Sequence, residues 1–278
     1  MNPQISAIIA GLDFLEGHLC HPITVGDIAD AAGYSLFHFI RTFNKIVKHT
    51  PYDYLMRRRL SLAAMLLFET NERVLDIGLT CQFESHEGFT RAFGRVFGMP
   101  PIVWREITTL DRRLLMPAFI KDDLLFREKP DFQPPELVQL DKKYLVGWMN
   151  FCESDNFDEE TSRKVFSEAL VNNPVPGRVD EAVWEIRDLQ TYGQQEMKFT
   201  GVLVNAIPAN AVGYVIKVVE QGQYLSLTDF QLSEYREAAL KYIYHTFIPK
   251  SGLHLGPAFE LAKCYEANKL FVPVEVTE

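Results

Sequence analysis

An internal repeat constrains this chain more than any other feature of its 278 residues. The stretch FIRTFNKIVKHTP, residues 39–51, returns as FTRAFGRVFGMPP, residues 89–101. Each copy begins with Phe, carries a basic residue at its third and seventh positions and ends in Pro. The repeat starts earlier still, because Asp27-Ile28-Ala29 matches Asp76-Ile77-Gly78. The offset changes from 49 to 50 between the two matches, so we expect one extra residue in a turn of the second copy.

Helix signals divide each copy into a short helix, a tight turn and a longer helix. Thr24 and Asp27 have the spacing of a capping box for a helix over 26–32, and Gly33 can take the left-handed conformation that ends it. Ser35 is placed to cap a longer helix that ends near residue 48. The second copy predicts helices over 74–79 and 85–97, and a long helix that starts at Pro51 joins the copies. This outline predicts two helix-turn-helix motifs, at about 24–48 and 74–97.

The longer helix of each copy separates aromatic from basic side chains. Successive residues of an α-helix rotate by about 100°, so Phe39 and Phe43 share one face while Arg41 and Lys45 point the opposite way. The same division recurs in the second copy, between Phe89, Phe93 and Phe97 on one side and Arg91 and Arg95 on the other. A solvated charged face is the ordinary explanation, but the duplication favours a pair of recognition helices for the major groove of DNA. Two such helices on a stiff connector can enter successive grooves about 34 Å apart, so a monomer could read an asymmetric site.

Net charge alone does not suggest a nucleic-acid partner. The chain has a net charge of −9, with 12 Lys+Arg and 12 Asp+Glu in residues 1–113 and 16 and 25 in residues 114–278. Any DNA contact of the neutral first half therefore needs a local basic face. The consecutive Arg57, Arg58 and Arg59 do not supply one, because consecutive helical residues point in different directions. We expect them to be solvated or to form internal ion pairs, with DNA backbone contact as the lesser alternative.

The second half of the chain is mainly strand-like. Four prolines and mixed charges predict a linker over 111–135, between domains at 1–110 and 136–278. Runs of β-branched and aromatic residues predict strands over 136–140, 144–151, 181–186, 198–206, 212–219 and 269–276. Helical patterns over 158–171 and 227–248 complete an α+β domain. The predicted fold is therefore multidomain, with an all-α tandem helix-turn-helix domain followed by an α+β domain.

A signature of aromatic, basic and proline residues connects the first half with a known family. The pattern F-x-S…F-T-R-x-F…P-x-x-W-R is present as Phe83, Ser85, Phe89, Thr90, Arg91, Phe93, Pro101, Trp104 and Arg105. Together with the first copy, it resembles the tandem motifs of the AraC/XylS family of bacterial transcription regulators, over residues 4–108. An N-terminal position for this domain is similar to the Rob branch. The resemblance implies double-stranded promoter DNA and RNA polymerase as partners, a cytoplasmic location and no cofactor.

The rotation argument and the resemblance together give the candidate DNA-binding residues. They are Phe37, His38, Ile40, Arg41 and Lys45 in the first copy and His86, Glu87, Thr90, Arg91 and Arg95 in the second. Relatives often carry Gln where this chain has Ile40 and Glu87. An apolar Ile could contact a thymine methyl, and a Glu could accept a hydrogen bond from cytosine N4. We therefore expect an operator unlike that of the well-known relatives.

The end of the chain resembles a second family. Gly256, Pro257, Phe259 and Glu260 match the G-P-x-F-E of GyrI-like effector-binding domains, although Ala262 stands where that family often has Tyr. Over residues 136–276, the resemblance implies two pseudo-repeated βαββ halves that enclose a ligand. It also implies that Glu260 is a pocket carboxylate, which would favour a cationic ligand. The candidate effector-binding residues are Trp148, Trp184, Tyr192, Tyr214, Phe259 and Glu260, because aromatic side chains line pockets for small apolar or cationic molecules, although core packing is their ordinary role.

Other functions stay open for the second half. Glu260 beside a tyrosine could be the general base of a small-molecule hydrolase, or the domain could bind another protein and no ligand. We expect no metal site, because His245 and His254 have no third ligand type nearby and the four cysteines form no C-x-x-C pair. The cysteines, Cys20, Cys81, Cys152 and Cys264, suit a reduced cytoplasm. No apolar run approaches the roughly 18 residues of a membrane span, and the start shows no signal peptide, so we expect no membrane partner.

Overall fold

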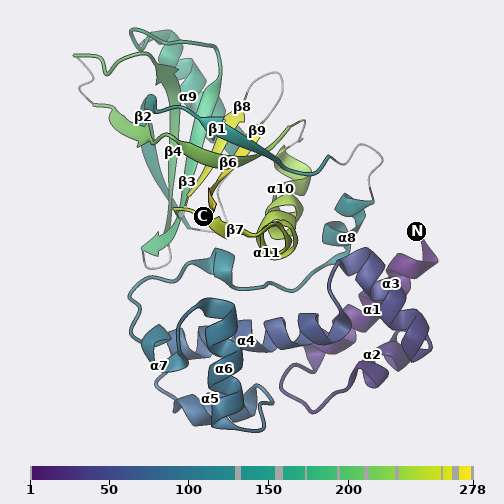
Figure 1. The fold of residues 1–278 in the computed structure, drawn as a ribbon. Helices are drawn as coiled ribbons and strands as arrows, with labels where there is room; N and C mark the ends of the chain where they lie inside the picture. The colour runs from purple at the N-terminus through teal and green to yellow at the C-terminus, as the bar shows by residue number, and fades with distance from the viewer. Residues whose placement is uncertain are drawn as a thin grey trace. The chain divides into compact units, whose positions relative to one another are not determined.

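The computed structural model describes residues 2–128, 133–153, 159–172, 174–192, 195–209, 213–228, 232–257, 259–264 and 269–276. The chain divides into two compact units (Figure 1). The first comprises residues 1–132 together with 237–246, and the second comprises residues 133–236 and 247–278. A short segment from late in the sequence therefore completes the first unit.

The first unit is helical and contains the predicted duplication. Helix α1 (Pro3–Gly17) precedes the first motif, and α4 (Pro51–Glu69) connects the two motifs. The first motif is α2 (Val25–Ala31) and α3 (Leu36–Val47), and the second is α5 (Val74–Thr80) and α6 (His86–Phe97). After them come α7 (Pro101–Trp104), the 3-10 turn η1 (Arg112–Leu114) and α8 (Lys121–Arg127). The prediction of a tandem helix-turn-helix domain is confirmed.

The turns of the two motifs use the same backbone device. Gly33 has a φ of 69° and Gln82 a φ of 64°, at an offset of 49 residues. The next residue of each turn donates its N–H to a carbonyl of the short helix, over 3.0 Å from Tyr34 to Ala29 and from Phe83 to Gly78. Helix α3 then starts three residues after Gly33, whereas α6 starts four residues after Gln82. The extra residue of the second copy thus lies in the turn, as predicted.

The predicted helix caps are formed in part. Asp27 and Thr24 form the reciprocal capping box, with Asp27 N–H to Thr24 Oγ1 at 3.2 Å and Thr24 N–H to Asp27 Oδ2 at 2.7 Å. The hydrogen bond from the Thr24 backbone lowers the pKa of Asp27. Ser85 caps α6 by accepting from the N–H of Gly88 at 3.1 Å. Ser35 stands at the equivalent position before α3, but its side chain makes no capping hydrogen bond, so that detail of the prediction was wrong.

Each motif has its own aromatic core. Phe39 and Phe43 of α3 are 0 % exposed and pack with the apolar face of α1. Phe89 and Phe93 of α6 are equally buried and pack around Trp104, whose Nε1 donates to the carbonyl of Ala64 at 3.0 Å. Burying one such side chain contributes about 1.5–3 kcal/mol. These contacts fix which face of each longer helix remains exposed.

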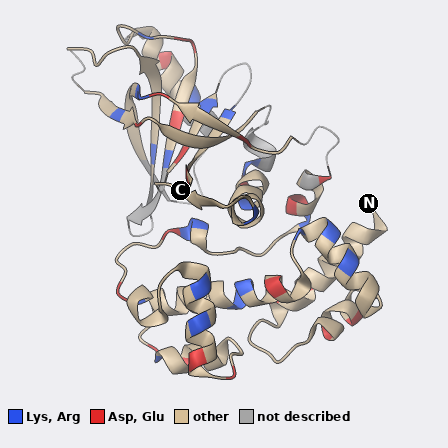
Figure 2. Cartoon of the chain, in the orientation of Figure 1, with Lys and Arg blue, Asp and Glu red and all other residues tan. Residues whose placement is uncertain are grey.

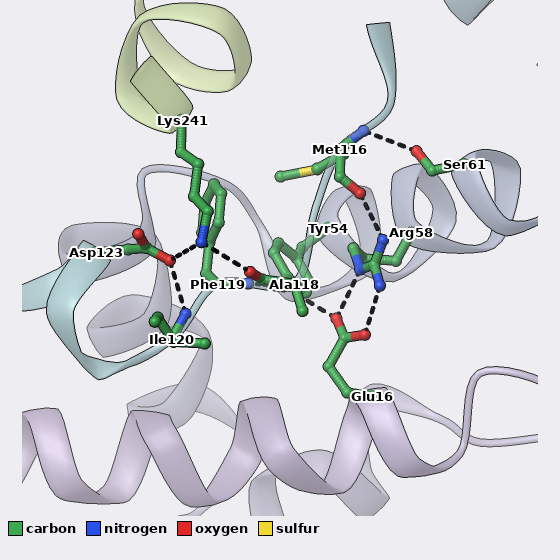
Figure 3. Close-up of polar contacts among 10 residues, drawn as sticks. All are labelled: Glu16, Tyr54, Arg58, Ser61, Met116, Ala118, Phe119, Ile120, Asp123 and Lys241. Carbon is green, nitrogen blue, oxygen red and sulfur yellow. Dashed lines mark hydrogen bonds and ion pairs between the residues drawn. The ribbon is translucent and has the colours of Figure 1, made fainter. Parts of the chain in front are cut away.

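The expected linker over residues 111–135 requires correction. Met116, Phe119 and Leu124 are buried in the same cluster as the first motif. The N–H of Met116 donates to Ser61 Oγ and the N–H of Phe119 donates to the hydroxyl of Tyr54, each over 2.9 Å (Figure 3). The prolines and charges of this stretch suggested an exposed connection, but the apolar residues between them cover α1, α3 and α4.

The three consecutive arginines of α4 make internal contacts. Arg58 forms a two-point ion pair with Glu16, with Nε–Oε1 at 2.7 Å and Nη2–Oε2 at 2.8 Å (Figure 3). Arg59 is buried and donates to two backbone carbonyls between α1 and α2. Arg57 pairs with Asp53 one turn earlier on the same helix. The expectation of internal pairing is confirmed.

The second unit is one curled antiparallel sheet with helices on one face. Among the described residues it has nine strands in the order β1-β6-β9-β8-β3-β4-β2-β5, with β7 beside β9. Its strands are β1 (Glu136–Leu140), β2 (Lys143–Glu153), β3 (Val183–Tyr192), β4 (Gln195–Val204), β5 (Val215–Val219), β6 (Gly222–Leu227), β7 (Leu253–Leu255), β8 (Phe259–Cys264) and β9 (Lys269–Val276). Its helices are α9 (Glu159–Asn172), the start of α10 (Leu232–Tyr242) and α11 (Ile248–Ser251). The predicted α+β class is confirmed.

The sheet consists of two equivalent halves that exchange a strand. The chain runs β1-β2-α9-β3-β4 and then β5-β6-α10-α11-β7-β8-β9. Each half therefore contains the predicted βαββ unit with one strand before it, and the second half adds α11 and the short β7. Strands β3 and β8 meet at the centre, where Ile186 is opposite Leu261. The first strand of each half pairs with the other half, β1 with β6 and β5 with β2. The predicted pseudo-repeat is confirmed. The exchange of the first strand between the two halves was not predicted.

Three strands and one helix boundary differ from the prediction. Strands β6, β7 and β8 were not predicted, and β6 ends at Leu227, the first residue of the region expected to be helical. Helix α10 begins only at Leu232 and passes into a π-helical turn, η2 (Ile243–Phe247), before α11. Short apolar runs give too few periods to separate strand from helix, and their pairing partners are distant in sequence.

Candidate DNA-reading surface and candidate effector site

Helices α3 and α6 present matching basic residues to solvent. Each helix has 12 residues, with its phenylalanines buried. Arg41 and Lys45 are exposed on α3, and Arg91 and Arg95 are exposed on α6. Figure 2 shows basic positions along both helices. The exposed cations lie away from the aromatic anchors, as the rotation argument predicts.

Both longer helices end in the same way. Lys48 (φ 65°) and Gly98 (φ 73°) adopt the left-handed conformation at an offset of 50 residues. Each donates its backbone N–H to a carbonyl one turn back, at 3.1 Å for Lys48 and 2.9 Å for Gly98. Pro51 and Pro101 then start the next helices from buried positions. The C-terminal ends of the two basic helices are therefore held by equivalent backbone turns.

Most of the other predicted DNA-binding residues are also exposed. Phe37 is 87 % exposed and Ile40 36 %, which leaves two apolar side chains on the outer face of α3. His86 and Glu87 are exposed in the first turn of α6. Asn44 and Lys48 lie on the exposed side of α3 as well and were not predicted. Their spacing of three and seven residues from Arg41 is the signal that would have found them.

Two predicted residues do not face outward. His38 is half-buried, with its ring edge against Tyr34 at 4.4 Å between centroids. Thr90 is also half-buried, and its hydroxyl is buried without a hydrogen-bond partner among the described residues. Eight of the ten predicted residues therefore lie on the exposed surface of the two helices.

The helix-covered face of the sheet, here called the helical face, contains one buried ion pair in duplicate. Arg163 is the fifth residue of α9, and Arg236 is the fifth residue of α10. Arg163 Nη1 lies 3.5 Å from Glu185 Oε1 on β3, and Arg236 Nη2 lies 3.4 Å from Glu260 Oε2 on β8. Because α9 corresponds to α10 and β3 to β8, the same helix-to-strand pair occurs once in each half.

Both carboxylates of these pairs are buried beside other polar groups. Glu185 is 2 % exposed, Glu260 1 % and Arg236 6 %. Thr200 of β4 is directly opposite Glu185, is 1 % exposed, and its hydroxyl has no hydrogen-bond partner within the described part of the chain. Burial raises the pKa of the Cys264 thiol to about 11, so this cysteine stays protonated near neutral pH. Charged groups at such depth are costly unless paired, which makes this cluster the strongest polar feature of the unit.

The predicted effector-binding residues do not form one site. Trp148 and Tyr214 lie on the helical face, with parallel rings 6.4 Å apart. Trp184 and Phe259 belong to the apolar cluster on the opposite face of the sheet. The side chain of Tyr192 lies outside the described residues. Glu260 is buried on the helical face and is paired with Arg236.

The described residues show neither a metal-binding cluster nor a membrane-spanning helix. They contain no group of three or more His, Cys, Asp or Glu side chains arranged to hold a metal ion. They also contain no helix long and apolar enough to cross a bilayer. Tyr265, the tyrosine that follows Glu260 most closely, lies outside the described residues, so the general-base arrangement gains no support from the geometry.

Two helix-turn-helix motifs on one connecting helix, each with an exposed basic longer helix, define a DNA-binding protein. Residues 28–107 match the helix-turn-helix domain family. The HTH-type transcriptional activator AarP of Providencia stuartii is 38% identical over 102 residues, which cover 37% of this chain and 76% of that protein. The chain belongs to the AraC/XylS family and is a DNA-binding transcription regulator.

The similarity to the relatives is not confined to the DNA-binding half. The Right origin-binding protein of Escherichia coli K12 is 29% identical over 270 residues, which cover 92% of this chain and 89% of that protein. A solved AraC-type transcriptional regulator from Chromobacterium violaceum is 27% identical, with a TM-score of 0.35, and covers 36% of this chain and 88% of that one. The Transcriptional regulator Rob of Salmonella typhimurium is 40% identical over 94 residues, which cover 34% of this chain and 32% of that protein. The curled sheet of the second unit is compatible with a GyrI-like domain.

Proposed function

We propose that this regulator inserts α3 and α6 into successive major grooves on one side of promoter DNA. The equivalent exposure of Arg41 and Arg91, on helices anchored in the same way, is the observation that carries the proposal. An arginine at the centre of a recognition helix can bond guanine O6 and N7 or clamp a phosphate. Two motifs in one chain remove the usual need for a dimer and let a monomer read an asymmetric site.

The residues on the two outer faces differ, so the two half-sites should differ as well. Ile40 and Phe37 give α3 an apolar character that suits thymine methyl groups. Glu87 places an acceptor at the start of α6, which suits the exocyclic amine of cytosine. RNA polymerase is the protein partner that a promoter-bound regulator of this family would contact.

Selection of bound DNA from a random pool tests this architecture directly. We expect the full-length chain to enrich a site with two unlike elements whose centres lie about one helical turn, roughly 10 base pairs, apart. Arg41→Ala and Arg91→Ala would then assign one element to each helix. Enrichment of a single element, or of no sequence at all, would contradict the two-groove proposal.

We also propose that a small apolar or cationic effector binds on the helical face of the second unit, with Glu260 as its polar contact. The duplicated buried pairs and the solitary hydroxyl of Thr200 support this location. Arg236 supplies the countercharge in the structure described here, so a cationic effector would replace its guanidinium at Glu260. An alternative is that the unit binds a protein and no small molecule.

Matched variants separate these possibilities. Glu260→Gln should weaken a cationic effector more than a neutral one, measured as the change in Kd by calorimetry. Glu185→Gln, the equivalent substitution in the other half, is the control and should affect the cationic effector less. Equal loss for cationic and neutral ligands in Glu260→Gln would refute the electrostatic role. If no compound of a cationic library shifts the melting temperature, the protein-binding alternative takes its place.

A further inference from the structure

The segment Glu237–Thr246 belongs to the DNA-binding unit, although it lies more than a hundred residues beyond it in sequence. Helix α10 begins in the second unit, where Arg236 pairs with Glu260, and ends in the first unit. The π-helical turn η2 continues it within the first unit. Turns of this kind are rare and often occur at functional positions.

The first anchor of this segment is a buried ion pair. Lys241 Nζ lies 2.9 Å from Asp123 Oδ2, and Asp123 is 2 % exposed (Figure 3). The same Asp123 oxygen accepts the N–H of Ile120 at 2.8 Å and so closes the first turn of α8. Residues of α8 pack in the cluster that surrounds α3. Lys241 is thus connected to the first recognition helix through α8.

The second anchor lies directly after the first recognition helix. His49 is the second residue beyond α3 and is buried. Its Nε2 lies 2.7 Å from the carbonyl oxygen of His245, and its Nδ1 lies 2.8 Å from Asp53 Oδ2. His49 therefore connects the end of α3 to the π-helical turn through its two ring nitrogens.

Aromatic contacts accompany the two anchors. The rings of Tyr242 and Phe126 are 6.5 Å apart, edge to face. The guanidinium of Arg113 lies 5.8 Å from the centroid of Tyr244. Arg113 lies in η1, which follows the second motif in the sequence. Among the contacts of the segment Glu237–Thr246 described here, the one between Tyr244 and Arg113 involves the residue nearest in sequence to that motif.

The second motif has no counterpart of His49. At the offset of 50 residues that relates the two helix ends, the position of His49 is occupied by Met99. Met99 packs against the apolar core of the second motif. The position of Asp53 is likewise occupied by an apolar residue, Val103. The two motifs therefore differ at the point where the segment Glu237–Thr246 contacts the end of α3.

We propose that Glu237–Thr246 is a positioning element for the first recognition helix alone, through which the second half of the chain controls the first half-site and not the second. The proposal rests on the proposed two-helix reading of DNA. An effector that draws Arg236 away from Glu260 would act on α10 and, through Lys241 and His245, on the end of α3. Helix α6 would keep its orientation, because its end is held by apolar packing.

The test uses the full-length chain and three DNA probes, namely the selected site and that site with either half scrambled. His49→Met places in the first motif the residue that the second motif has. Lys241→Met removes the other anchor, and Lys164→Met, on the exposed side of α9, is the matched control. We expect both anchor variants to lose about 5-fold or more in affinity for the intact site. We expect no loss on the probe whose first half is scrambled, and no loss for the control on any probe.

Equal loss on both scrambled probes, loss confined to the second half-site, or unchanged affinity for the intact site would each overturn the proposal. Lys241→Met leaves Asp123 buried without its cation, which can prevent folding. If that variant does not fold, the double variant Lys241→Met/Asp123→Asn replaces it, with the same expectation. Failure of the two-helix proposal is distinguishable, because then no two-element site would be selected in the first place.

Discussion

Arg41 and Arg91 occupy the same place in two helices. Each is the sixth residue of a 12-residue helix, each is exposed, and each lies between two fully buried phenylalanines in sequence. Because the two positions are equivalent, the effects of substituting Arg41 and Arg91 on DNA binding can be compared directly.

Arg41→Ala and Arg91→Ala should each weaken specific DNA binding by about 1–3 kcal/mol, because alanine removes a bidentate contact to guanine or a phosphate clamp. Gel-shift titration on the selected site measures the change. Lys121→Ala, an exposed cation on α8, is the control and should leave affinity unchanged. Unchanged binding in both arginine variants would remove the basis for two reading helices.

Ile40 should make the first half-site sensitive to thymine methyl groups. Replacing the contacted thymine by deoxyuridine removes one methyl, and we expect a loss of about 0.8 kcal/mol, the value of one buried methylene-sized group. Ile40→Ala should bind both DNAs equally, because its side chain no longer reaches the methyl. A wild-type protein that ignores deoxyuridine throughout the first half-site would contradict this assignment.

Tyr54→Phe should lower the free energy of unfolding of the first unit by about 1–3 kcal/mol. The Tyr54 hydroxyl donates to Glu16 Oε1 at 3.0 Å and accepts the N–H of Phe119 at 2.9 Å, and burial raises the pKa of the phenol (Figure 3). Phenylalanine would leave the buried N–H of Phe119 without its acceptor and remove one hydrogen bond from Glu16, which keeps its ion pair with Arg58. Urea unfolding followed by Trp104 fluorescence, in a chain with Trp148→Phe and Trp184→Phe, reports on this unit. Tyr52→Phe, at an exposed tyrosine, should be neutral.

His245 should make the first unit less stable in mild acid. Burial, together with the nearby charges of His49 and Arg57, lowers the pKa of His245 to about 3 from 6.5. Between these values the unfolded chain binds a proton that the folded chain excludes, so stability falls as pH falls below 6.5. At 1.36 kcal/mol per pH unit, the loss at pH 5 is about 2 kcal/mol.

Melting curves between pH 7 and pH 5 measure this effect. His245→Gln, which cannot titrate, should remove most of the pH dependence of the first unit. His254→Gln, at an exposed histidine, should leave it as it is. A wild-type first unit whose stability is constant over this range would show that His245 titrates normally.

The sequence predicted the features that depend on local periodicity. The separation of Phe43 from Arg41 follows from the rotation of a helix, so the exposed face of each longer helix was predicted nearly whole. Phe259 and Glu260 were grouped in one pocket because β8 was not recognised. Adjacent residues of a strand face opposite sides of a sheet, and this alternation separates them.

Pairings between distant segments could not be predicted. Nothing local indicates that Arg236 meets Glu260 or that Lys241 meets Asp123, because these contacts depend on how the two halves of the chain fold back. The burial of Phe119 in the expected linker is of the same kind. The composition of a stretch predicts only whether it is exposed on average. These contacts depend instead on single apolar or charged side chains within an otherwise polar stretch.

The exchanged strands of the sheet bear on how the second unit is made during synthesis. Strand β1 pairs with β6, so it must wait for about 80 residues of later chain before its partner leaves the ribosome. Until then its backbone is an unpaired edge, open to wrong partners. Strand β1 carries the exposed polar residues Glu136 and Gln139. Polar side chains of this kind oppose aggregation while the strand is still unpaired. Neither half of the sheet is complete until both have been synthesised, because each contributes its first strand to the other.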